Sequence, residues 1–182
     1  SAASDVYKRQ AKGYDIFGKA IIKILNKYPD WSANVIGDEP REEFNFDHKN
    51  LNMLGFKKHN EVLSNFEKTS IAVVCSRWNE PFGRTSLEAS SRGCGVIISN
   101  RGGLPETITN GIILKNLNTK NLFIEIESLI KNKNKLKKLQ AETLKNFTLD
   151  DNFISKKIDH YRIQNLPLKI NSAGVIPAIF AS

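Results

Sequence analysis

The chain has 182 residues, of which 40% are hydrophobic and 25% are charged. This length allows one domain with a full hydrophobic core and excludes two comfortable ones. The composition is that of a soluble globular protein. No apolar run approaches the roughly 20 residues of a membrane span, and the N-terminus lacks a basic-then-apolar export signal. We therefore expect a cytoplasmic protein.

The formal net charge of +8 calls for a negatively charged partner. Nucleic acid, an anionic lipid surface and phosphate-bearing small molecules all fit this charge. Much of the excess is lysine in 114–145 and 156–157, where it is typical of the solvated face of amphipathic helices. A nucleic-acid partner is not expected, because aromatic and arginine residues are not interleaved with these lysines. Peripheral contact with the inner face of the membrane stays open.

The cysteines and histidines predict no metal site. Cys75 and Cys94 lie in apolar surroundings without metal-ligand spacing, so we expect buried free thiols. His48, His59 and His160 are scattered along the chain.

The two ends differ from the middle. Residues 1–10 show no hydrophobic period and resemble a translated sequencing-adaptor end, so they are set aside and an upstream part of the natural chain is expected to be missing. Residues 11–164 form the predicted domain. Residues 165–182 contain Pro167, Gly174 and Pro177 and are expected to form a poorly defined tail, with a docking segment as the alternative.

Hydrophobic periodicity predicts alternating helices and strands. In chain order we expect a helix at 14–28, a strand at 33–37, a charged loop at 38–49, a strand at 51–55, a helix at 60–69, a strand at 71–75, a loop at 76–83, a helix at 84–92, a strand at 95–99, a brief helix at 105–108, an edge strand at 111–114, and helices at 118–131, 135–146 and 150–163. Such alternation predicts a doubly wound α/β domain with a parallel, Rossmann-like sheet.

Ligands of such sheets bind outside the carboxyl ends of the strands. Three loops leave strands at that edge, at 55–57, 76–83 and 100–103, and each contains glycine and contains or borders a basic residue. Glycine lets the backbone approach a ligand closely. The segment 82–86 also opens a helix, whose first amides attract anions. The sequence therefore predicts a phosphate-containing ligand.

Glu80 and Glu88 refine this prediction. Glu80 lies in the loop before that helix, and Glu88 lies about one turn inside it. A phosphate at the helix start would repel both carboxylates, so they are better assigned to neutral hydroxyls on either side. A carboxylate accepts two hydrogen bonds from a vicinal diol. Diol, diphosphate and diol together outline a nucleoside-diphosphate sugar.

The stretch from Arg77 to Ala89 resembles the Glu-x7-Glu motif of glycosyltransferase family 4. Gly93, 96–99 and 102–106 agree with that family in order and spacing, and the resemblance covers about 12–161. It implies the C-terminal, donor-binding domain of a GT-B enzyme with two Rossmann-like domains. It also implies retention of anomeric configuration, no cofactor and no obligatory metal held by the protein.

The resemblance implies a role for individual residues. Glu80 would hold and polarise the transferred sugar, Glu88 the ribose diol, and Lys12 would neutralise the diphosphate leaving group. We take Glu80 and Lys12 as the catalytic pair. The family's arginine upstream of this lysine is not at its usual spacing here, which agrees with a missing upstream part. The remaining expected donor contacts are Gly55, Phe56, Phe82, Gly83, Arg84, Thr85, Gly102 and Gly103.

The expected donor contact of Arg84 is its backbone amide, and the arginine and tryptophan side chains near this edge are not expected to be catalytic. Arg77, Arg84 and Arg101 are expected to lie in solvent, and Trp31 and Trp78 are expected to be packing residues, with Trp78 as part of the pocket wall as the alternative.

The sequence thus predicts a retaining hexosyltransferase of cell-envelope polysaccharide synthesis. Its donor would be a nucleotide sugar, and its saccharide or lipid-linked acceptor would bind the missing N-terminal domain, so this chain alone is expected to be inactive. A sugar-nucleotide isomerase or epimerase of the same fold remains an alternative. A non-catalytic basic binding module is the other.

Overall fold

The computed structural model describes residues 12–37, 46–147 and 176–181. The helices in these ranges are α2 (Tyr14–Lys27), α3 (His59–Glu67), α4 (Arg84–Ser91), the 3₁₀ helix η1 (Leu104–Thr107), α5 (Thr119–Lys131) and α6 (Lys133–Lys145). The strands are β1 (Trp31–Ile36), β2 (Leu51–Gly55), β3 (Ile71–Val74), β4 (Gly95–Ser99), β5 (Ile112–Leu114) and β6 (Ile176–Ala181). Each matches a predicted element within about two residues except β6, and the predicted helix 150–163 lies outside the described residues.

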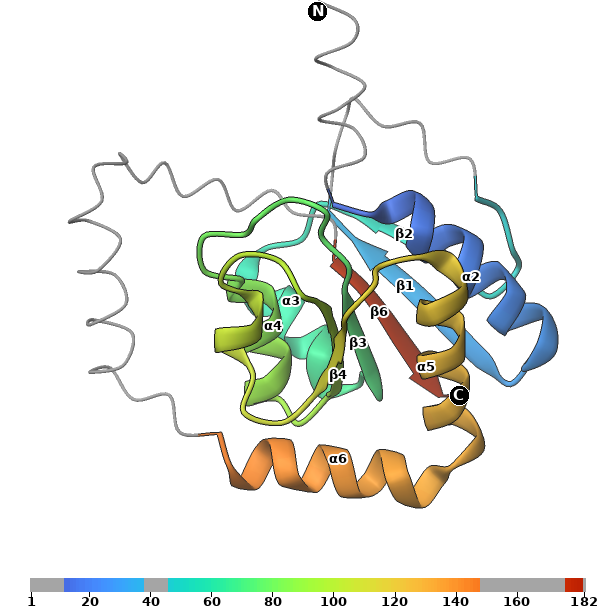
Figure 1. The fold of residues 1–182 in the computed structure, drawn as a ribbon. Helices are drawn as coiled ribbons and strands as arrows, with labels where there is room; N and C mark the ends of the chain where they lie inside the picture. Colours follow the sequence, from blue (N-terminus) through green and yellow to red (C-terminus); the bar gives the residue numbers. More distant parts are fainter. Residues whose placement is uncertain (1–11, 38–45, 148–175, 182) are drawn as a thin grey trace, which may run out of the picture.

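The strands form one sheet in the order β2-β1-β6-β3-β4-β5 (Figure 1). Strand β1 is parallel to β2, and β3, β4 and β5 are parallel to one another. The predicted α/β class is confirmed. Residues 176–181, which lie in the expected tail at 165–182, form a strand in the middle of the sheet.

Strand β6 runs antiparallel to both of its neighbours. It pairs with β1 from Trp31↔Ala181 to Ile36↔Ile176, and with β3 only at Ile179 and Ala178. Pro177 lies outside the part that is paired with β3. Proline donates no ladder hydrogen bond, so it is tolerated where a strand is paired on one side only.

Helices cover both faces of the sheet. Helices α2 and α5 pack together on one face, α3 and α4 lie on the other, and α6 packs against β4 and α4 (Figure 1). The core alternates accordingly: Ile71 and Val73 belong to the cluster under α2 and α5, whereas Ala72 belongs to the cluster under α3 and α4. A strand buried on both faces explains the continuous apolar run of β3.

Both cysteines are free and buried, as predicted. Burial raises the pKa of the Cys75 thiol and of the Cys94 thiol to about 12. Among the described helices, none combines the length and apolar character that a membrane crossing requires.

Candidate functional site

The carboxyl ends of the parallel strands and the first turns of α2 and α4 meet at one edge of the sheet (Figure 1). Helix α2 begins directly against the end of β3. Gly13 has a φ of 68°, and an added Cβ there would lie 1.9 Å from the carbonyl oxygen of Cys75. The Cys75 thiol donates to the carbonyl of Gly13 at 3.3 Å. This contact holds Lys12, the residue before Gly13, beside the loop that follows β3.

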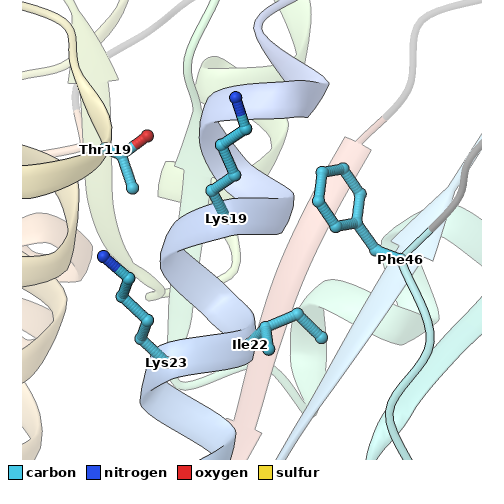
Figure 2. Close-up of a pocket in the computed structure, with 5 residues that line it drawn as sticks. All are labelled: Lys19, Ile22, Lys23, Phe46 and Thr119. Carbon is cyan, nitrogen blue, oxygen red and sulfur yellow. The ribbon is translucent and has the colours of Figure 1, made fainter.

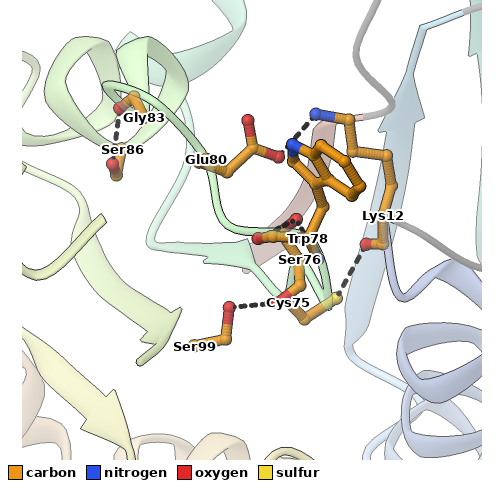
Figure 3. A network of polar contacts seen from close by, with 8 residues as sticks. All are labelled: Lys12, Cys75, Ser76, Trp78, Glu80, Gly83, Ser86 and Ser99. Carbon is orange, nitrogen blue, oxygen red and sulfur yellow. Dashed lines mark hydrogen bonds and ion pairs between the residues drawn. The ribbon is translucent and has the colours of Figure 1, made fainter. Parts of the chain in front are cut away.

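Lys12 and Glu80 form an ion pair at this edge. Lys12 Nζ lies 2.5 Å from Glu80 Oε1, although the residues are 68 positions apart in the sequence (Figure 3). The Glu80 side chain is 15% exposed and that of Lys12 is 39% exposed. The structure therefore brings the two predicted catalytic residues together.

The loop after β4 supports the backbone of Glu80. Gly103 donates its amide to the carbonyl of Glu80 at 2.7 Å. Gly102 has a φ of 55°, and a Cβ there would lie 2.4 Å from the same oxygen. Two predicted donor contacts thus lie against Glu80, and the amide of Gly103 is already engaged within the protein.

Helix α4 begins at Gly83, whose φ is 65°. The Gly83 carbonyl accepts from the amide and the hydroxyl of Ser86, and an added Cβ would lie 2.6 Å from Leu104 Cδ2. Within the described ranges, no protein group accepts from the amides of Gly83, Arg84 and Thr85. Three unpaired amides at a helix start form a site for an anion.

Glu88 lies one turn into α4 and is 15% exposed. Its Oε1 accepts from Arg84 Nε at 2.7 Å and lies 3.6 Å from His59 Nδ1. The Arg84 side chain is 57% exposed, in agreement with the expectation that it lies in solvent, and it also pairs with Glu88. Sequence reasoning missed His59, because only the packing of α3 against α4 brings this lone histidine to Glu88. Its place four residues after Gly55, at the same edge, was the available signal.

Gly55 and Phe56 lie at the far end of this edge. Gly55 has a φ of 63° and its carbonyl accepts from the amide of Gly37 at 2.9 Å. Strands β1 and β6 separate β2 from β3, which places the ends of β2 and β3 roughly 14 Å apart at about 4.8 Å per strand. Phe56 is 64% exposed there. The site is therefore elongated along the sheet edge.

The Arg77 side chain is only 33% exposed, which corrects the expectation that it lies in solvent. Its guanidinium donates to both carboxylate oxygens of Asp15, at 2.5 and 2.7 Å. Burial alone would raise the pKa of Asp15, but the hydrogen bonds and charge of Arg77 outweigh it and the pKa lies below its usual value. Trp78, expected to be a packing residue, is 60% exposed.

A separate surface depression lies away from this edge, on the outer side of α2. It has a volume of about 480 Å³ (Figure 2). Its lining residues are Lys19, Ile22, Lys23, Phe46 and Thr119. None of them is a predicted site residue, and the depression contributes nothing to the site at the strand ends.

The sequence of the chain is similar to those of known sugar transferases. The chain is 30% identical over 113 residues to the lipopolysaccharide core biosynthesis mannosyltransferase LpsB of Rhizobium meliloti. The aligned region covers 57% of this chain and 32% of LpsB. The chain spans between 24% and 32% of the first curated relatives that it matches.

Solved structures show the same fold. The C-terminal domain of a glycosyl transferase group 1 family protein (LpcC) from Francisella tularensis superposes with a TM-score of 0.66 at 28% identity, over 82% of this chain and 81% of that one. Anabaena Alr3699/HepE in complex with UDP and glucose matches with a TM-score of 0.54 at 21% identity, over 65% of this chain and 33% of that one. The fold is therefore that of the C-terminal domain of a GT-B glycosyltransferase.

The profile of one family, described as glycosyl transferases group 1, matches residues 7–146. That range contains the Lys12–Glu80 pair, the amides that open α4 and Glu88. The chain belongs to the group 1 family of glycosyl transferases.

Proposed function

We propose that this chain is the donor-binding part of a retaining hexosyltransferase that uses a nucleoside-diphosphate sugar. The observation that carries the proposal is the arrangement of charge at the start of α4. Unpaired amides at Gly83, Arg84 and Thr85 lie between two largely buried carboxylates, Glu80 and Glu88. An anion fits the amides, and hydroxyl groups fit the carboxylates.

The arrangement assigns a separate part of the donor to each group. The amides of α4 bind the diphosphate, Glu88 binds the ribose diol and Glu80 binds hydroxyls of the transferred sugar. Phe56, roughly 14 Å along the edge, lies toward the base. The complex of Alr3699/HepE with UDP and glucose, a protein of the same fold, is in keeping with this class of donor.

Lys12 supplies the charge that the leaving group needs. As the glycosidic bond to the diphosphate breaks, negative charge develops on the phosphate oxygens, and a cation and amides held in place stabilise it. Lys12 has three N–H donors and, within the part of the chain that the structure describes, makes one ion pair, to Glu80 Oε1. It can therefore keep this pair while another N–H meets a phosphate oxygen. In this proposal Glu80 orients the sugar and takes no proton.

The acceptor and the membrane complete the proposal. The chain spans about a third of its relative LpsB, so we assign the saccharide or lipid-linked acceptor to a further domain and transfer to the cleft between the two. Helix α6 is rich in lysine and carries Leu144, which is 60% exposed. Such a helix fits peripheral contact with an anionic membrane surface. Vesicles with and without phosphatidylglycerol test this contact, and equal absence of binding to both would contradict it.

Calorimetry with nucleoside diphosphates of different bases tests the ribose assignment. We expect Glu88→Gln to weaken nucleotide binding about tenfold, because two hydrogen bonds from the diol to a charged acceptor are worth about 1.4 kcal/mol or more. A nucleotide without ribose 2′ and 3′ hydroxyls should bind both proteins equally. Glu142→Gln, on α6, is the control. Equal affinity of Glu88→Gln and the parent for the complete nucleotide would remove the ribose role.

A further inference from the structure

Trp78 is an exposed tryptophan on a loop beside the site. It lies in the loop after β3, two residues before Glu80, and is 60% exposed. A tryptophan loses considerable favourable burial energy in such a position, because its side chain has a large apolar area. An isolated exposed aromatic would need no explanation. The rigidity of this loop and its place beside Glu80 make Trp78 a different case.

The backbone that carries Trp78 is fixed on three sides. The Ser76 hydroxyl accepts from the amide of Trp78 and donates to its carbonyl, both at 3.1 Å (Figure 3). The Ser99 hydroxyl, at the end of β4, donates to the carbonyl of Ser76 at 2.6 Å. Between these contacts, Arg77 is held to Asp15 by two hydrogen bonds. The loop therefore holds the backbone of Trp78 in one place, so that ligand binding has to order only its side chain.

The chemistry next to Trp78 selects the kind of ligand. Glu80 offers hydroxyl acceptors, and Lys12 offers a cation at 2.5 Å from it. A hexose ring has a rim of hydroxyl groups and a face of C–H groups. Hydrogen-bond acceptors beside a flat apolar ring match both parts of such a ligand.

We propose that the indole of Trp78 is the stacking surface for the face of a sugar ring whose hydroxyl groups bind Glu80. This inference rests on the proposed function and deepens it, because it names the residue that distinguishes a sugar-bearing nucleotide from a bare one. Phe56 serves the opposite end of the site and should not make this distinction. The ring is that of the donor sugar, because Glu80 is assigned to the hydroxyls of the transferred sugar; stacking of an acceptor saccharide is the outcome that the ligands below exclude.

The test compares UDP, GDP and ADP with the same diphosphates carrying glucose, on the full chain. We expect Trp78→Ala to weaken binding of the glucose-bearing form about tenfold, the effect of one good aromatic stacking contact, and to change binding of the bare diphosphate less than twofold. Trp78→Phe should retain part of the preference. Phe56→Ala should weaken both forms by the same factor. If bare and glucose-bearing forms respond alike to Trp78→Ala, while binding of maltose falls, the stacked ring is an acceptor and the inference about the donor sugar is overturned.

Fluorescence gives an independent readout, since the chain has two tryptophans. In a Trp31→Phe background only Trp78 contributes tryptophan emission, and UDP-glucose should change this emission where UDP does not. In Trp78→Phe only Trp31 contributes tryptophan emission. Trp31 begins β1, at the end of that strand away from the site, so no sugar should change its emission. Unaltered affinity of Trp78→Ala for every sugar-bearing ligand overturns the inference while leaving nucleotide binding intact. Failure of every nucleotide to bind overturns the proposed function, and this inference with it.

Discussion

The Arg77 guanidinium and the Asp15 carboxylate form a two-bond ion pair, with N–O distances of 2.5 and 2.7 Å, that joins the loop after β3 to the first turn of α2. Asp15 lies three residues after Lys12, and Arg77 lies three residues before Glu80. The two ion pairs therefore connect the same two segments at neighbouring points. The Asp15–Arg77 pair is placed to hold Lys12 against Glu80.

Replacing Asp15 with asparagine should destabilise the protein in a pH-dependent way. The pKa of Asp15 is lowered in the folded state, so its contribution is fully present above the unfolded pKa of about 3.9 and is lost as the pH falls through the lower, folded pKa. At pH 7 we expect Asp15→Asn to lose about 1 kcal/mol, the upper range for a partly exposed pair. Urea unfolding should show this difference narrowing as the pH falls below about 4.

The control for this prediction is the pair of Glu67 and Arg92, which has one contact at 3.6 Å and more exposed side chains. Glu67→Gln should change the free energy of unfolding by less than about 0.5 kcal/mol at either pH. A stability difference for Asp15→Asn that stays constant from pH 7 to pH 3 would show that the pair contributes through packing and not through charge.

Alanine substitutions at Gly13 and Gly93 should distinguish the energetic cost of a steric clash from that of backbone strain. Both have a left-handed φ, of 68° and 73°, but a Cβ at Gly13 would lie 1.9 Å from a backbone oxygen, whereas at Gly93 the nearest atom is 3.8 Å away. We expect Gly93→Ala to cost about 1 kcal/mol, the left-handed penalty alone. Gly13→Ala should cost at least about 3 kcal/mol in thermal or urea unfolding, because α2 must move away from β3. Equal losses in the free energy of unfolding for the two variants would contradict the close contact between Gly13 and the end of β3.

The reactivity of the two cysteine thiols should measure unfolding of the whole domain. With a pKa of about 12, each cysteine is about one part in 10⁴ thiolate at pH 8, and both are buried. A disulfide reagent should therefore label neither thiol in the native chain and both in denaturant. Cys75→Ser and Cys94→Ser variants identify which thiol reacts first when urea is added. Rapid labelling of either one without urea would contradict its burial.

The place of β6 can be tested with proline. Ile179 pairs with Ala33 on one side and with Ile71 on the other, whereas Ala181 pairs only with Trp31 at the end of the strand. Ile179→Pro should destabilise the chain by about 3 kcal/mol or more, because the ring cannot be accommodated between two paired neighbours. Ala181→Pro should cost much less. Similar unfolding curves for the two variants would remove β6 from the sheet.

Local patterns were sufficient for most of the fold. The apolar β-branched runs at 71–75 and 95–99 predict strands buried on both faces, and the structure has them as β3 and β4. The glycine and proline signals around 100–108 likewise predict the turn into η1. These elements depend on their own residues, so periodicity and turn chemistry define them.

Features that need a distant partner could not be predicted in this way. Strand β6 contains Pro177, and its stability comes from the free edges of β1 and β3. The contact of His59 with Glu88 depends on how α3 packs against α4. The spacing of Glu80 and Glu88 identified the carboxylates, but only the assembled sheet edge shows that Lys12 and Glu80 are already paired.

The central place of β6 also has a consequence for the order in which the chain folds. Trp31 pairs with Ala181, which is 150 positions further along the chain (181 − 31). Until residues 176–181 are available, β1 and β3 each present an unpaired edge, and no described strand other than β6 links the two parallel halves of the sheet. Contacts of such high sequence separation slow folding. During synthesis the two halves are therefore exposed to pairing with other chains until these residues emerge, which makes this interval the time of greatest aggregation risk.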